Sequence, residues 1–174
     1  MPKPSFRLYI ALSLDGYIAT PDGGVDWLKP FDSATAGYAE FISEIGAIVI
    51  GRKTYEQVRG FGDWPYAGIR TIVLSSEMLE TLPEDTAIWR DGIEVLADEL
   101  AGEQRDIWVL GGAAVIGSFL QHRLIDRMEM FVMPVLLGTG IRLFEVDMAM
   151  QHLRCRDIER FDCGAVRLDY GVDR

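Results

Sequence analysis

Residues 106–120 read Asp-Ile-Trp-Val-Leu-Gly-Gly-Ala-Ala-Val-Ile-Gly-Ser-Phe-Leu, an apolar run that passes through two adjacent glycines into a second apolar segment. The run from Ile107 to Leu110 has no polar alternation, which is typical of a strand covered on both faces in a parallel sheet. A helix is expected directly after the glycines. Without side chains there, a ligand can approach the backbone, and the helix N-terminus favours an anion such as phosphate. A tight turn used only for close packing is the alternative interpretation.

Strands and helices alternate through the first two thirds of the chain, and the last third is mostly strand. Apolar and β-branched runs predict strands, and apolar residues at helical spacing predict helices. The expected strands are 6–14, 47–50, 70–74, 85–89, 106–110, 127–137, 153–161 and 166–170, and the expected helices are 33–44, 93–100 and the segments that follow residues 51 and 112. This order is typical of an α/β protein with a mostly parallel mixed central sheet and antiparallel C-terminal strands.

A second strand-to-helix junction repeats the geometry of the first. A buried strand ends at Gly51, and Arg52 and Lys53 follow it directly. Thr54 and Gln57 have the spacing of a capping box, which places the two cations at the N-terminus of a helix. Because the helix dipole and the side-chain charges add, this junction and the glycine pair together predict an anion site. A solvated basic turn remains the alternative interpretation of these residues.

The composition is acidic, with 27 Asp and Glu against 17 Lys and Arg, a formal net charge of -10 and a pI near 4.6. Such a charge disfavours a nucleic-acid partner. The N-terminal apolar run, residues 6–14, is too short to span a membrane. We therefore expect a cytoplasmic protein that binds neither nucleic acid nor membrane, folded as one domain over residues 1–174.

Several motifs that carry chemistry in other proteins are missing from this sequence. It contains no G-x-G-x-x-G, no G-K-[ST] and no G-x-S-x-G. Its only histidines are His122 and His152, and Cys155 and Cys163 lack the spacing of metal ligands. A metal site and a hydrolase triad therefore have little support, and acid-base chemistry is expected from carboxylates or water.

Four stretches in this order resemble the dihydrofolate reductase superfamily: 10–19, 50–56, 74–76 and 109–113. Within it, three further stretches resemble the reductase domain of the riboflavin-biosynthesis deaminase-reductase and its stand-alone relatives: 13–16, 124–126 and 134–144. The resemblance covers nearly the whole chain. It implies a three-layer α/β/α fold of the dihydrofolate reductase type and an oxidoreductase activity.

The resemblance implies NADPH as the cofactor, with Arg52, Ser75 and Ser76 at the adenosine 2′-phosphate. Glu77 follows the serines directly. Its carboxylate would repel that phosphate and weaken the binding of NADPH against that of NADH. NADH is therefore a possible second cofactor.

The resemblance also implies where the remainder of the dinucleotide would lie. Lys53, Thr54 and the backbone of residues 112–115 would hold the pyrophosphate, and Ala11 and Ile18 would border the nicotinamide. A cis peptide bond between the paired glycines is implied as well. The complete set of expected cofactor-binding residues is Ala11, Ile18, Gly51, Arg52, Lys53, Thr54, Ser75, Ser76, Gly111, Gly112, Ala113, Ala114 and Val115.

Asp32 is the candidate catalytic residue. Dihydrofolate reductases carry an acid a short way after a tryptophan, and the interval from Trp27 to Asp32 resembles that arrangement. In the riboflavin branch this acid is not a dependable feature. Asp32 therefore either protonates a ring nitrogen of a pterin-like substrate or caps the following helix, and both interpretations stay open.

The implied function is that of an NAD(P)H-dependent reductase resembling 5-amino-6-(5-phosphoribosylamino)uracil reductase of riboflavin biosynthesis. It would transfer hydride to a ribosylaminopyrimidine or pterin-like small molecule. The alternatives are a dinucleotide-binding homodimer without turnover and a reductase of an unrelated small carbonyl or imine compound. The zinc-deaminase motif is absent. The relatives are usually homodimers, and the strand 128–137 with Leu143 and Phe144 is the expected interface.

Overall fold

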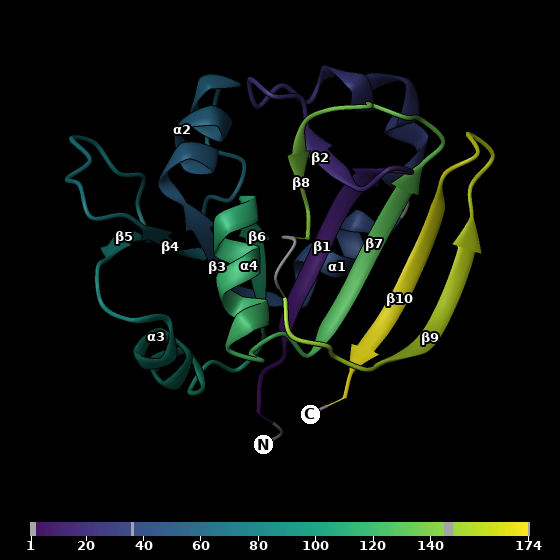
Figure 1. Ribbon diagram of the computed structural model, residues 1–174. Helices are drawn as coiled ribbons and strands as arrows, with labels where there is room; N and C mark the ends of the chain where they lie inside the picture. Colours follow the sequence, from purple (N-terminus) through teal and green to yellow (C-terminus); the bar gives the residue numbers. More distant parts are fainter. Residues whose placement is uncertain (1–2, 36, 145–147, 174) are drawn as a thin grey trace.

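The computed structural model describes residues 3–35, 37–144 and 148–173, and for residues 32–35 the backbone alone (Figure 1). Strands and helices alternate up to β7, and strands follow. The elements in chain order are β1 (Phe6–Ser13), β2 (Tyr17–Ala19), the 3₁₀ segment η1 (Asp26–Thr35), α1 (Tyr38–Ser43), β3 (Ile45–Gly51), α2 (Arg52–Gly60), β4 (Arg70–Leu74), β5 (Thr86–Trp89), α3 (Ile93–Leu100), β6 (Asp106–Gly111), α4 (Ala113–Gln121), β7 (Arg127–Met133), β8 (Ile141–Arg142), β9 (Leu153–Arg160) and β10 (Val166–Val172).

One sheet organises the molecule, with the strand order β5-β4-β3-β6-β1-β7-β10-β9. The strands from β5 to β7 pair in parallel, and β10 pairs antiparallel with both β7 and β9. The short strands β2 and β8 form a separate antiparallel pair. The predicted mostly parallel mixed sheet with antiparallel C-terminal strands is therefore confirmed.

Helices cover the two faces of the sheet, which gives three layers. Successive residues of a strand point to opposite faces, so Phe6 and Leu8 of β1 join the side chains of α3 and α4 on one face. On the other face Ile48 and Ile50 of β3 pack against α1 and α2. Figure 1 shows α4 in front of the sheet and α1 behind it. No helix in the described parts of the chain is long and apolar enough to cross a membrane.

The parallel strands bring the two predicted strand-to-helix junctions together. Ile50 of β3 pairs with Gly111 of β6, and Gly51 pairs with Leu74 of β4. The starts of α2 and α4 and the serines that follow β4 therefore lie at one edge of the sheet. Ligands of α/β sheets bind at this carboxyl edge.

Two predicted boundaries were wrong by four or more residues. The helix expected over residues 33–44 begins only at Tyr38, because residues 26–35 form a 3₁₀ segment and Gly37, with a left-handed φ of 91°, is the N-cap of α1. The strand expected over 127–137 ends at Met133, since Pro134 has no N–H group for a ladder hydrogen bond. Trp27, within that 3₁₀ segment, packs beside Phe131.

Candidate functional site

A cavity of about 580 Å³ opens between β1, β2 and the N-termini of α2 and α4. Its lining is mostly apolar or aromatic, with a few polar groups at the helix starts. Six of the predicted residues line it: Ala11, Ile18, Lys53, Thr54, Gly112 and Ala113. The structure thus brings residues of β1, β2, α2 and α4, far apart in the sequence, around one space.

The two helices that reach this cavity begin without side-chain caps. The N-cap residues are Gly51 for α2 and Gly112 for α4, both extended, and neither start has a side-chain hydrogen bond. In α4 the first bond within the helix runs from the N–H of Ile116 to the carbonyl of Gly112 at 3.0 Å. The preceding N–H groups, those of residues 113–115, have no carbonyl to bond within the helix. They are suitably placed to bind an anion.

The starts of the two helices are in close contact. A Cβ atom added at Gly112 would lie 2.9 Å from the Thr54 hydroxyl oxygen, and one added at Gly51 would lie 3.0 Å from a methyl group of Val115. Both glycines therefore permit an approach that a side chain would block. The peptide bond between Gly111 and Gly112 is cis, as the sequence resemblance predicts, and Gly111 has a φ of 129°.

The predicted capping box was wrong. Because α2 already begins at Arg52, Thr54 lies in its first turn, and its hydroxyl faces Gly112 instead of capping its own helix. The Gln57 side-chain amide donates to the carbonyl of Gly23 at 2.7 Å. Both side chains instead line the cavity.

Arg52 lies outside the cavity lining, beside the end of β4. Its guanidinium forms ion pairs with Glu56 at 2.9 Å and with Glu77 at 3.3 Å. The Ser75 hydroxyl accepts a hydrogen bond from the N–H of Glu77 and donates one to its carbonyl, both at 3.0 Å. Ser76 is exposed beside them. The residues predicted to bind the adenosine 2′-phosphate therefore lie together in one corner. The guanidinium of Arg52 in that corner is already paired with two carboxylates.

Three aromatic residues that sequence reasoning missed line the cavity, and the rings of the two tyrosines both lie against that of the tryptophan: Tyr9, Tyr66 and Trp108. The Tyr9 ring stacks on Phe41 at 4.1 Å. Burial, with a smaller contribution from the charge of Glu129, raises the pKa of Tyr9 to about 12. Trp108 is 6% exposed, and neither its indole N–H nor the Tyr9 hydroxyl has a hydrogen-bond partner among the described residues.

Two aspartates lie near the ends of the cavity-forming elements, Asp32 in η1 and Asp15 in the turn after β1. Asp32 belongs to η1, but its side chain lies outside the described residues, so its catalytic role stays a prediction. Asp15 accepts hydrogen bonds from the Ser13 hydroxyl at 2.6 Å and from the N–H groups of Leu137 and Gly138. The Ser13 bond is the main cause of its lowered pKa. Asp15 thus joins the turn after β1 to the segment after β7.

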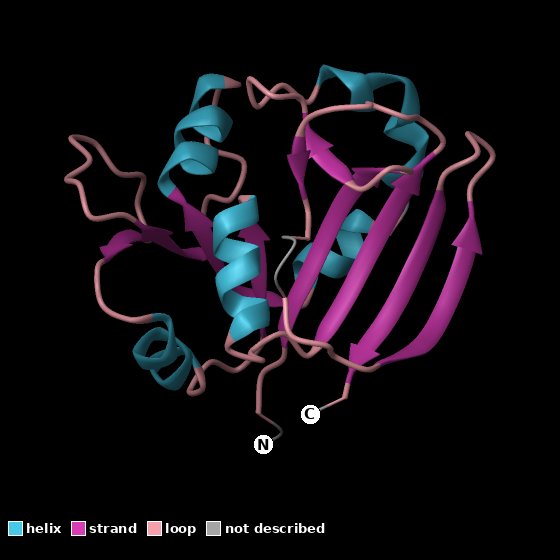
Figure 2. Cartoon of the chain, viewed as in Figure 1, coloured by secondary structure: helices cyan, strands magenta, loops and turns pink. Residues whose placement is uncertain are grey.

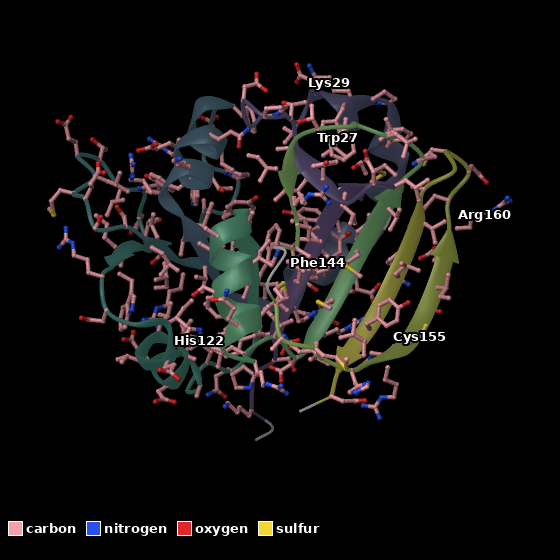
Figure 3. The ribbon with its side chains drawn as sticks, in the orientation of Figure 1. Trp27, Lys29, His122, Phe144, Cys155 and Arg160 are labelled. Carbon is pink, nitrogen blue, oxygen red and sulfur yellow. The ribbon has the colours of Figure 1, made fainter. Side chains whose placement is uncertain are left out.

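Neither His122 nor Cys155 lines the cavity. Figure 3 shows His122 at the lower end of α4 and Cys155 on the outer strand β9. The His122 ring nitrogen Nδ1 lies 2.8 Å from the carbonyl of Ser118, and both cysteines are free thiols. Within residues 3–35, 37–144 and 148–173, no cluster of three or more His, Cys, Asp or Glu side chains could hold a metal ion.

Comparison with known proteins gives consistent matches over nearly the whole chain. Residues 4–167 match the family model described as the RibD C-terminal domain. The uncharacterized protein YwjB of Bacillus subtilis (strain 168) is 34% identical over 166 residues, which are 94% of this chain and 95% of YwjB.

Two solved structures show the same fold. A crystal structure from Shewanella sp. PV-4, provisionally described as a riboflavin biosynthesis protein, has a TM-score of 0.87 and 28% identity and covers 98% of this chain and 99% of its own. Dihydrofolate reductase from Enterococcus faecalis, complexed with NADP(H) and RAB-propyl, has a TM-score of 0.72 and 18% identity, and the match covers 98% of this chain and 97% of that one. The predicted fold of the dihydrofolate reductase type is therefore confirmed.

Proposed function

The chain belongs to the RibD C-terminal domain family, within the dihydrofolate reductase-like superfamily, and on this premise we propose that it is an NAD(P)H-dependent reductase. The observation that carries the proposal is the junction of α2 and α4, where two uncapped helix starts, Lys53 and Thr54 border one end of a cavity of about 580 Å³. An apolar pocket with an anion site at its mouth suits a cofactor that combines a flat ring with a pyrophosphate.

The residues of this chain fit such a dinucleotide. The space that a Cβ atom at Gly112 would fill allows a phosphate to approach the first turn of α4. Lys53 and the Thr54 hydroxyl would bind the same pyrophosphate from α2, and Ala11 and Ile18 would border the nicotinamide in the cavity. When bound, the reduced nicotinamide supplies hydride from its C4 atom.

The substrate in this proposal is a ribosylaminopyrimidine or pterin-like heterocycle. Tyr9, Tyr66 and Trp108 supply aromatic faces and edges in the cavity, which suit a planar ring. Trp108 is buried there and the two tyrosines are half-buried, so together they restrict water around the place where donor and acceptor carbons would meet, and catalysis would rest mainly on orientation. Asp32 is the proposed proton donor to a ring nitrogen of that substrate.

We propose further that two copies assemble as a homodimer, through a different surface from the one that the sequence suggests. Within the interface that the sequence suggests, Met130 and Leu143 are buried in the subunit's own core, whereas Leu136 and Phe144 are exposed, so only part of that stretch is open to a partner. The sheet face of β9 and β10 has no helix over it in Figure 2, and on β9 it exposes Leu153 and Ile158. Apolar side chains exposed on a sheet face are typical of interfaces.

Titration with NADH and NADPH, followed by nicotinamide fluorescence, tests the cofactor part of the proposal. Micromolar binding that weakens at least ten-fold in Lys53→Met supports it, since the cation contacts the pyrophosphate, and Lys29→Met serves as the control because Lys29 is exposed on η1. A panel of pterins and ribosylaminopyrimidines, offered with cofactor deuterated at C4, then tests turnover. Deuterium in a product establishes hydride transfer, and the absence of binding of either nucleotide refutes the proposal.

A further inference from the structure

Resting on the proposed function, we infer that this chain selects NADH over NADPH and that Glu77 is the residue that sets the choice. Arg52, Glu56, Ser75 and Glu77 form a corner at the ends of β3 and β4.

The strand order places the adenosine end of a bound dinucleotide at this corner. Ala11 lies on β1, the helix junction lies at the ends of β6 and β3, and Ser75 follows β4, so these sites succeed one another along the sheet order β1-β6-β3-β4. Three strand spacings amount to roughly 14 Å, a length that an extended dinucleotide reaches. A nicotinamide beside Ala11 and a pyrophosphate at Gly112 therefore direct the adenosine ribose toward Arg52 and Glu77.

The charges in this corner oppose a 2′-phosphate. Arg52 contacts two carboxylates, Glu56 on its own helix and Glu77 across the strand end, so the three side chains together carry one net negative charge. Arg90, the arginine that follows β5, has its guanidinium against the Met78 sulfur at 2.7 Å. A phosphate would have to share Arg52 with both acids or displace them.

The same groups favour an unmodified ribose. A carboxylate is a pure hydrogen-bond acceptor and so can accept a bond from the ribose 2′-hydroxyl of NADH, as acidic residues do in other NAD sites. The Ser75 hydroxyl is bonded to the backbone of Glu77, and this contact holds the acid beside Arg52. Arg52 in turn orients the Glu77 carboxylate through their ion pair.

The expected discrimination is modest, because the corner is partly exposed. The Arg52 and Glu77 side chains are 32% and 65% exposed, so solvent and salt screen their charges. Two anions that share one guanidinium lie about 5 Å apart, and at that separation a carboxylate weakens the binding of a phosphate dianion on the order of five-fold. The lost hydrogen bond to the 2′-hydroxyl adds to this difference.

The experiment compares the dissociation constants of NADH and NADPH for the wild-type protein, Glu77→Gln and Glu80→Gln, by nicotinamide fluorescence at low salt. Glu80 is the matched control, because it is an exposed acid on the same segment and its substitution changes the net charge equally. The wild-type protein is expected to bind NADH about five-fold more tightly than NADPH. In Glu77→Gln this ratio is expected to approach one, whereas Glu80→Gln keeps the wild-type ratio.

Two outcomes overturn the inference while leaving the proposed function intact. In the first, the wild-type protein binds NADPH as tightly as NADH or more tightly. In the second, Glu77→Gln keeps the wild-type ratio of the two constants. Failure to bind either nucleotide instead refutes the proposed function, and the inference falls with it, so the two failures are distinguishable. Unfolding midpoints of the three proteins, expected to agree because both glutamates are exposed, verify that they fold alike.

Discussion

Replacing Gly112 with alanine tests the contact between the starts of α2 and α4. The added Cβ atom would lie 2.9 Å from the Thr54 hydroxyl oxygen, closer than real Cβ atoms approach, so Thr54 or the first turn of α4 must shift. The Cβ atom also occupies the space through which a phosphate reaches the N–H groups of residues 113–115. Hydrogen bonds to charged groups contribute about 1.5–3 kcal/mol each, so loss of one corresponds to a roughly 10- to 100-fold weaker dinucleotide affinity.

The assay is the fluorescence titration with NADH, and the matched control is Gly92→Ala. Gly92 is also a helix N-cap, that of α3, and a Cβ atom added there has nothing within 4 Å. It is expected to bind NADH as the wild-type protein does. Overpacking at Gly112 is expected to lower the free energy of unfolding by about 1–3 kcal/mol, which urea denaturation measures. An affinity for Gly112→Ala within two-fold of the wild-type value would refute the proposed phosphate path.

Three further predictions concern stability and assembly. Arg7→Met removes the shortest ion pair of the buried Glu129, at 2.6 Å, and leaves it the contacts with Arg127 at 3.2 Å and Arg167 at 4.0 Å. The free energy of unfolding in urea is expected to fall by about 3 kcal/mol, the low end for a broken buried ion pair, and a loss below about 1 kcal/mol contradicts this. Because the folded pKa of Tyr9 is about 12, above its ordinary value of 10.0, its contribution to stability is full below pH 10 and is lost as the pH rises toward 12. In Tyr9→Phe the urea unfolding midpoint should therefore decrease less between pH 10 and pH 12 than in the wild-type protein. An equal decrease in both proteins would contradict the raised pKa of Tyr9 as its cause. Ile158→Glu places a charge on the exposed face of β9 and is expected to convert the dimer into a monomer, which the molar mass from light scattering measures. A monomeric wild-type protein would rule out the proposed dimer.

Local sequence patterns predicted the parallel part of the sheet and both strand-to-helix junctions, because these features depend on short runs of apolar residues that end at glycines. Residues 107–110 are apolar on both faces of the sheet, and the two glycines after them mark where the strand ends. The pattern Thr54-x-x-Gln57 misled because a capping box does not tell whether the helix has already begun. Gly51, with its extended φ of -79° and ψ of 152°, is the N-cap instead.

The aromatic end of the cavity could not be predicted, because it depends on strand order. Tyr9 lies in β1 and Trp108 lies in β6, and in the sequence each looks like an ordinary strand residue. Only the parallel pairing of β1 with β6 brings them to the same face, where their rings lie 6.3 Å apart. A useful signal was present in the spacing, since Tyr9 lies two residues before Ala11 and so points to the same face of the sheet.

A crystal structure of the complex with NADH locates the nicotinamide ring and so shows whether this cavity is the cofactor site. We expect the ring to lie between Ala11 and Ile18, with the pyrophosphate at the N–H groups of residues 113–115 and beside Lys53. A nucleotide bound elsewhere, with the cavity beside Ala11 unfilled, would contradict the assignment of this site as that of a reductase.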